Sequence, residues 1–385
     1  DLFNGRNFSD DTTMLTNLAN EPFSVLFGNS SHSQHPPLLG VFLSILFQPF
    51  KQLFSDFYAF RLTLIIYEAL GAVFFWFTAS AVIKSTKMRN LVLIGLVIFP
   101  VGWMGTVVMP QDEVVSFFWI TLVMWLFTQK RFFLTLFFCG IGVVAGKVFF
   151  LIPLLGLVVT IREHNFILRG LIGILPVALT YLATLYFSGM NNDSGTVLGF
   201  TPAAMFGVNW WVLVWKYFGF TNEECKQYSS VLALVGGVIP AILLWARTSI
   251  QDRTGGLYQQ TQLCMILAML LWVYALFYHI NPEYYIIVFP LLLVCFNSAL
   301  KLIGIGFLMT APWAVNFFYG VDYAITNAVG DSGRTAFVKV YSAVFPFSPS
   351  FWHHLALVVN SILTIYFAYV ATKRVLDYSS NSNNR

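Results

Sequence analysis

Two pairs of adjacent carboxylates are the features of the sequence best suited to chemistry. Asp10 and Asp11 stand in the stretch NFSDDTTML, and Asp112 and Glu113 stand in MPQDEVVSF, a short turn between two apolar segments. One carboxylate of such a pair can accept a proton from a hydroxyl group that attacks an activated carbon. Together the two can also bind a divalent cation, which prefers oxygen ligands. The alternative reading is that both pairs are ordinary solvated loop charges.

Two further polar turns carry residues suited to an anionic ligand. Lys147 interrupts the apolar stretch VVAGKVFFLIP, and His279 and Glu283 stand in YHINPEYYIIVFP. The lysine ammonium and the histidine ring can donate charge-assisted hydrogen bonds to a phosphate group. A short turn between apolar segments has little reason to carry charge unless it borders water or a ligand. Solvated loop charges are again the alternative.

The stretch SSHSQHPPLLG, residues 30–40, places two histidines before a double proline. His32 and His35 are three residues apart, a spacing that would suit a metal on a helix, but the following proline disfavours a helical backbone at His35. The favoured interpretation is that the segment positions the chain, because Pro36-Pro37 restricts the backbone just before the apolar run Leu38–Phe50. That run is too short to cross a bilayer, so we expect a helix that lies along the membrane surface.

The composition decides which elements must position these residues. Of the 385 residues, 58% are hydrophobic and 10% are charged, whereas soluble domains average about 45–50% and about 25%. No aqueous fold of this length can bury so much apolar side chain. The sequence therefore predicts an all-α, polytopic transmembrane helical bundle. The four cysteines show no metal-like spacing, and we find no basic surface suited to nucleic acid.

Eleven apolar segments are predicted to be transmembrane helices. They lie near residues 60–83, 91–109, 114–128, 132–146, 148–161, 168–188, 229–246, 262–279, 284–299, 301–319 and 352–372. The segment Trp210–Phe218, with its paired tryptophans, is predicted to lie at the membrane interface. If the chain starts in the cytoplasm, one further span is expected before Asp1.

Basic residues predict the sidedness of the bundle, because short cytoplasmic loops collect Lys and Arg. Alternate gaps between the predicted spans, with the C-terminal tail, hold 13 of the 21 basic residues: Lys84, Lys87, Arg89, Lys130, Arg131, Arg162, Arg169, Arg247, Arg253, Lys301, Lys373, Arg374 and Arg385. They hold only three acids, Glu163, Asp252 and Asp377. These gaps are therefore predicted to be cytoplasmic. The opposite face then holds the two acidic pairs, Lys147, His279, Glu283 and the segment His35-Pro36-Pro37-Leu38, which we call the His-Pro segment.

Glu68 is a separate candidate within the membrane. It lies seven residues after Arg61 in FRLTLIIYEALGAVFF, about two turns along one helix face. An intramembrane acid is a candidate for function, and a structural hydrogen bond to a neighbouring helix is the alternative.

The order of the N-terminal motifs resembles the GT-C glycosyltransferase superfamily, and most closely the protein O-mannosyltransferases and the lipid A aminoarabinose transferases. The matching residues are the acidic pair Asp10-Asp11, the segment His35-Pro36-Pro37-Leu38, Arg61-Leu62, and an acid of the second external loop at Asp112 or Glu113. HINPEYYIIVFP is similar to a late turn of the superfamily, with one insertion. The acidic pair departs from the Asp-Glu of those families, and HPPLLG lacks the lysine of HPPLGK, so neither sugar nor acceptor is specified.

The resemblance implies an inverting membrane glycosyltransferase that moves a sugar from a polyprenyl-phosphate carrier to a glycan, lipid or protein acceptor at the extracytoplasmic face. Asp10 would be the base and Asp11 would support it, while Asp112, Glu113, Lys147, His279, Glu283 and His35 would bind the donor phosphate or substrate. No cofactor or metal is expected to be required, although a divalent cation can bind such acids. The membrane would be a bacterial or archaeal plasma membrane or that of the endoplasmic reticulum.

The implied organisation has four parts. Residues 1–59 form an extracytoplasmic loop with an interfacial helix, 60–161 the transmembrane module most like the superfamily, 162–372 the remaining spans and loops, and 373–385 a cytoplasmic tail. Two other readings stay open. A secondary transporter would also need polar groups in a helical bundle, although its sites commonly lie at the midplane of repeated halves, and a non-catalytic subunit would share the fold without the activity.

Overall fold

The computed structural model of the chain describes residues 13, 15–27, 35–98, 113–161, 165–188, 208–239, 242, 256–278, 280–296, 298–327 and 339–383. Every regular element within these ranges is a helix, so the described part of the chain is all-α, as the sequence predicts. Each apolar segment predicted as a span coincides at least partly with a helix.

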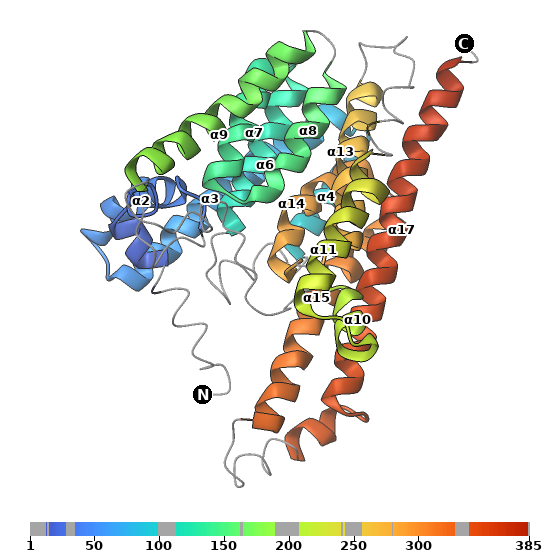
Figure 1. The fold of residues 1–385 in the computed structure, drawn as a ribbon. Helices are drawn as coiled ribbons and strands as arrows, with labels where there is room; N and C mark the ends of the chain where they lie inside the picture. Colours follow the sequence, from blue (N-terminus) through green and yellow to red (C-terminus); the bar gives the residue numbers. More distant parts are fainter. Residues whose placement is uncertain are drawn as a thin grey trace.

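The first half of the chain forms a group of helices on the left of Figure 1. They are α2 (Leu39–Lys51), α3 (Asp56–Val82), α6 (Glu113–Thr128), α7 (Phe132–Ala145), α8 (Leu151–Thr160) and α9 (Phe166–Ser188). α3 packs along α6, α6 along α7, and α7 along α9. Fully buried phenylalanines such as Phe75 on α3 and Phe127 on α6 fill the space between them, and burial of such side chains stabilises the packing.

In the second half of the chain, α13 (Gly256–Leu276) packs against α11 (Asn222–Ala233), α14 (Tyr285–Cys295) and α17 (Pro349–Asn383). This half also contains α10 (Trp211–Phe218) and α15 (Ala299–Asn327), and α4 (Thr86–Ile98) packs against α14 and α15. α14 is buried along its whole length. A helix that is apolar on all sides is expected in such a central position.

Three glutamines near the start of α13 bind the ends of three other helices. The side-chain amides of Gln259, Gln260 and Gln262 donate to the carbonyls of Thr128, Val294 and Thr160 at 3.0, 2.8 and 2.9 Å. These carbonyls belong to the last residues of α6, α14 and α8, where the helix itself supplies no donor. The sequence Gln-Gln-Thr-Gln therefore joins four helices at one end of the bundle.

Among the described residues, four helices are long and apolar enough to cross a membrane: Asp56–Val82, Phe166–Phe187, Gln259–Leu276 and Pro349–Asp377. Shorter apolar helices occupy Leu39–Lys51, Glu113–Thr128, Phe132–Ala145, Val148–Thr160, Tyr285–Cys295 and Leu300–Val315. Together these helices indicate a membrane protein. The larger number of spans expected from the sequence stays a prediction.

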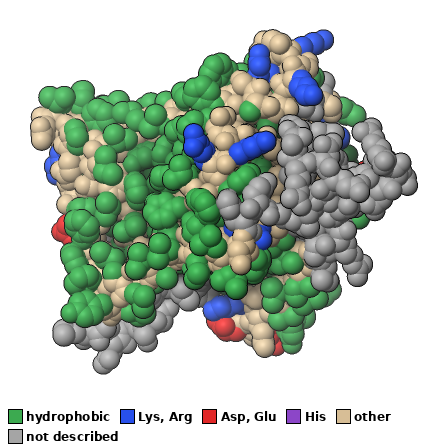
Figure 2. Space-filling view, turned by 90° about the horizontal axis from the view of Figure 1, so that it is seen from above, with side chains coloured by type: hydrophobic (Ala, Val, Ile, Leu, Met, Phe, Trp, Pro, Cys, Tyr) green, Lys and Arg blue, Asp and Glu red, His purple; other side chains and the backbone are tan. Residues whose placement is uncertain are grey.

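The end of the molecule that carries the C terminus is rich in basic side chains. Figure 2 looks down on that end and shows a few separate groups of Lys and Arg side chains on a mostly apolar face, whereas Asp and Glu appear only near its rim. α10 lies towards the opposite end of the bundle (Figure 1). The sidedness expected from the sequence stays a prediction.

Candidate functional site

Glu113 and Lys147, 34 positions apart in the sequence, form an ion pair. Lys147 Nζ lies 2.7 Å from Glu113 Oε1, and the two side chains are only 16% and 10% exposed. Glu113 lies in the first turn of α6, where the helix dipole stabilises a carboxylate. Lys147 lies between the end of α7 and the 3₁₀ turn Val148–Phe150. Because both partners are largely removed from water, their attraction is stronger than that of a surface pair.

The turn that presents Lys147 is pressed against α6. The backbone N–H groups of Gly146 and Lys147 both donate to the carbonyl of Gly142, at 2.9 and 3.1 Å. A Cβ atom at Gly146 would lie 2.8 Å from the Gly142 carbonyl oxygen and 3.1 Å from Ser116 Oγ. Only glycine fits this approach without a shift of the backbone. The Ser116 hydroxyl is itself buried and has no hydrogen-bond partner among the described residues.

We therefore expect Gly146→Ala to displace Lys147 from Glu113 and to lower the free energy of unfolding by about 1–3 kcal/mol, the usual cost of overpacking. Thermal unfolding of the purified protein measures the effect. Gly170→Ala is the matched control, because a Cβ there would meet nothing within 4 Å. Equal melting temperatures for the two variants would show that the turn is not tightly packed.

A second turn, Pro282–Tyr284, reaches the ion pair through Tyr284. Lys147 Nζ lies 5.7 Å from the centroid of the Tyr284 ring, which is itself 4.9 Å from the ring of Phe149. Tyr284 ends the 3₁₀ turn Pro282–Tyr284, and its carbonyl accepts a hydrogen bond from the Tyr274 hydroxyl at 2.8 Å. The ammonium group is thus held between a carboxylate and an aromatic ring, both of which attract a cation.

The segment Val208–Trp211 holds the chain just before the Pro282–Tyr284 turn in place. The backbone N–H of Val208 donates to the carbonyl of Ile280 at 2.8 Å. The indole N–H groups of Trp210 and Trp211 donate to the carbonyls of Ala275 and Leu276 at 2.7 and 2.6 Å, so they bind the C-terminal end of α13. The paired tryptophans, which sequence reasoning assigned to the membrane interface, therefore have a structural role at the end of α13.

Tyr278 packs beside this capping segment, in a small cluster with Trp211 and Cys225. Burial raises the pKa of Tyr278 to about 12. Its hydroxyl therefore stays protonated throughout the physiological range.

The His-Pro segment lies against the end of α7. The backbone N–H of Leu38 donates to the carbonyl of Val144 at 2.8 Å, three residues before Lys147. Pro37 is buried and His35 is half-buried, with both ring nitrogens removed from solvent. The helix predicted to follow is present as α2. Through this hydrogen bond, the chain just before α2 is held against the end of α7, close to Lys147.

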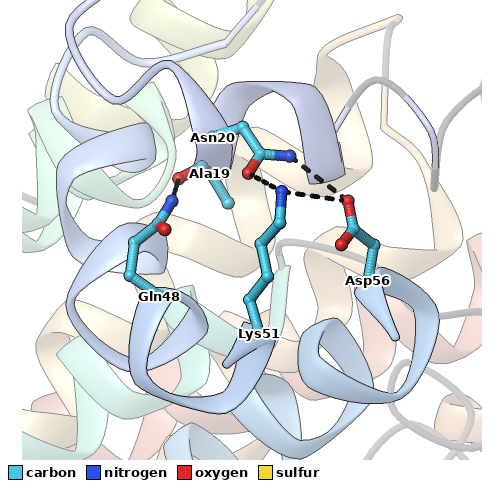
Figure 3. Close-up of polar contacts among 5 residues, drawn as sticks. All are labelled: Ala19, Asn20, Gln48, Lys51 and Asp56. Atoms are coloured by element: carbon cyan, nitrogen blue, oxygen red, sulfur yellow. Dashed lines mark hydrogen bonds and ion pairs between the residues drawn. The ribbon is translucent and has the colours of Figure 1, made fainter. Parts of the chain in front are cut away.

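Polar contacts tie residues 15–20 to the corner between α2 and α3 (Figure 3). Lys51 Nζ donates to Asn20 Oδ1 at 2.7 Å and lies 3.4 Å from Asp56 Oδ2. Gln48 Nε2 donates to the Ala19 carbonyl at 3.1 Å. A Cβ at Gly40 would lie 2.9 Å from the carbonyl oxygen of Leu18, so the two backbones touch. These contacts fix residues 18–20 against the corner between α2 and α3.

The predicted site residues fall into three groups. Glu113 and Lys147 are in contact, and His35 lies in the segment bound to the end of α7. Asp10, Asp11, Asp112 and His279 lie outside the described residues, as does the side chain of Glu283, whose backbone is in the turn next to Tyr284. Glu68 is half-buried within α3.

Within the described ranges, no group of three or more His, Cys, Asp or Glu side chains could hold a metal ion.

Sequence reasoning missed three contributors to the site. The sequence predicts only a turn motif around Tyr284, an apolar helix that contains Ser116, and a membrane-interface position for Trp210 and Trp211. A signal for Ser116 was its position three residues after Glu113, on the same face of α6. Nothing in the local sequence indicates which helix end the tryptophans contact.

Comparison with known proteins leaves the class of the protein open. No protein-family model matches the chain, and no curated protein matches it. Any assignment of function to the site therefore depends on its own residues and geometry.

Proposed function

We propose that the chain is a polytopic membrane glycosyltransferase of the GT-C type, which transfers a sugar from a polyprenyl-phosphate carrier to an acceptor at the extracytoplasmic face. The observation that carries the proposal is the shielded Glu113–Lys147 ion pair at the meeting of separate turns. The start of α6, the turn after α7 and the turn before α14 meet there, and the His-Pro segment is bound beside it. All four are segments that the sequence predicts to be on the outer side.

The proposed reaction is a single displacement. The acceptor hydroxyl oxygen forms a bond to the anomeric carbon, and the bond from that carbon to the phosphate oxygen breaks. The hydroxyl proton passes to the Asp10 carboxylate, which is the general base, and polyprenyl phosphate leaves with the bonding electron pair. Asp11 orients the acceptor or supports the base.

The remaining residues of the proposed site act on the phosphate and on substrate position. Lys147 and His279 neutralise the negative charge that develops on the leaving phosphate. A fixed positive charge in a water-poor site is an effective way to stabilise such a transition state. Asp112, Glu113, Glu283 and His35 line the same site. The acids can hold a divalent cation, but no step of this reaction requires one.

The position of the Glu113–Lys147 pair favours a transferase over a transporter. Glu113, Lys147 and the Tyr284 turn lie at helix ends, whereas transporters commonly bind their substrates near the middle of broken helices. Arg61, seven residues before the intramembrane acid Glu68, lies with its guanidinium 4.5 Å from the ring of Phe57. Arg61 therefore contributes to packing at the start of α3.

The test is an assay with two readouts on the purified chain in proteoliposomes. We expect a polyprenyl-phosphate-linked sugar to be consumed in proportion to glycosylated product when candidate acceptors are supplied. Accumulation of solute inside the vesicles, without consumption of the lipid-linked sugar, would support the transporter instead. Neither consumption nor accumulation across a panel of donors and acceptors would support a non-catalytic subunit.

A further inference from the structure

The Glu113–Lys147 ion pair raises a problem for any anionic ligand of Lys147. A carboxylate 2.7 Å from the ammonium group already neutralises it. A phosphate that approaches the same ammonium must therefore either share it with a like charge or replace it as the partner. Like charges close together in a poorly hydrated place repel strongly.

We infer that the Glu113 carboxylate and the phosphate group of the ligand compete for Lys147, so that Glu113 is an internal counter-ion that the ligand displaces. This inference rests on the proposed function for the identity of the phosphate. It changes the role of Glu113, which the resemblance places among the residues that bind the donor phosphate or substrate.

The surroundings of the pair suit an exchange of partners. Lys147 also lies near the face of the Tyr284 ring, so part of its environment stays favourable when the carboxylate moves. The buried Ser116 hydroxyl, one helical turn after Glu113 and beside Gly146, has no hydrogen-bond partner among the described residues. A phosphate oxygen bound beside Lys147 can accept a hydrogen bond from the Ser116 hydroxyl, a bond that the Glu113–Lys147 pair does not supply.

The exchange has a consequence for the reaction cycle. Lys147 is kept charged and solvent-shielded by Glu113, so no bare cation has to be buried in the absence of the phosphate. After transfer, the return of Glu113 to Lys147 favours release of the phosphate product. The internal carboxylate thus weakens ground-state binding, which leaves more of the binding energy for the transition state.

Glu113→Gln tests the competition, because it removes the charge and preserves the size of the side chain. We expect the purified full-length variant in lipid nanodiscs to bind a long-chain polyprenyl phosphate about tenfold more tightly than the wild type, equivalent to about 1.4 kcal/mol. The matched control is Glu223→Gln, the same change at an exposed position of α11. We expect it to bind as the wild type does.

Further arms separate the source of the phosphate from the competition itself. Polyprenol, which lacks the phosphate, should bind equally to wild type and Glu113→Gln. A gain with inorganic phosphate but none with polyprenyl phosphate would keep the competition and contradict the lipid-linked donor. The double variant Glu113→Gln/Lys147→Met should lose the gain entirely, because the cation for which the two anions compete is absent.

Three results would overturn the inference. If Glu113→Gln binds polyprenyl phosphate as tightly as the wild type, or more weakly, Glu113 does not compete for Lys147. If the double variant retains the gain, the competition does not act through Lys147. If neither protein binds any phosphate probe, both the inference and the proposed function are wrong. Glu113→Asp is the second variant in case Glu113→Gln does not fold, and its shorter carboxylate should give a smaller gain in the same direction.

Discussion

Lys147→Met should abolish binding of polyprenyl phosphate and reduce sugar transfer at least about 100-fold, the usual cost of removing a preorganised group that stabilises developing charge. The same change should destabilise the fold. It leaves the carboxylate of Glu113, only 10% exposed, without its counter-ion. Breaking a buried pair in this way costs about 3–5 kcal/mol, and we expect about 2–3 kcal/mol because this pair keeps some contact with water.

The matched control is Lys51→Met, which removes a lysine from the exposed pair with Asp56. Those two side chains are 39% and 47% exposed, and surface pairs contribute about 0–1 kcal/mol. Thermal unfolding and polyprenyl-phosphate binding should be measured on both variants. An equal loss of stability in the two proteins would show that the Glu113–Lys147 pair is no better shielded than a surface pair. Unchanged binding in Lys147→Met would remove Lys147 from the phosphate site.

Asp10→Asn should reduce turnover by about 10²–10⁴-fold, the contribution typical of a general base, while expression and donor binding stay close to those of the wild type. The amide has nearly the shape of the carboxylate but cannot accept the proton of the acceptor hydroxyl. Rates should be compared at saturating donor, so that a change in affinity does not contribute.

Asp11→Asn is the comparison for this prediction. The resemblance gives Asp11 a supporting role, so its amide variant should retain more activity than Asp10→Asn. Full activity in Asp10→Asn, or a loss seen only in Asp11→Asn, would move the base to another residue. Loss of donor binding in Asp10→Asn would instead indicate a structural role for this aspartate.

The positions of the helices could be predicted from the sequence because a sufficiently long apolar segment is expected to form a membrane helix. The short helix α2 was predicted in the same way, from an apolar run after Pro36-Pro37. Helix ends were less accurate. The apolar segment that follows Lys147, for example, begins with a 3₁₀ turn, and α8 starts only at Leu151.

The contacts between helix ends could not be predicted. Hydrophobic periodicity reports which face of a helix is buried, but it does not say which partner covers that face. The Glu113–Lys147 pair, the contact of Lys147 with Tyr284, and the glutamines of α13 all join residues brought together only by the packing of several helices. The sequence does predict a sidedness from its basic residues, and that prediction groups Glu113 and Lys147 on one face before any contact is known.

The most direct test is the anomeric configuration of the transferred sugar, measured by nuclear magnetic resonance on product made from a lipid-linked donor of known configuration. The central claim is that one site, with a base and a phosphate-binding lysine, transfers the sugar in a single displacement. That claim predicts a product of inverted configuration. A product of retained configuration, or no product from any polyprenyl-phosphate sugar, would contradict it.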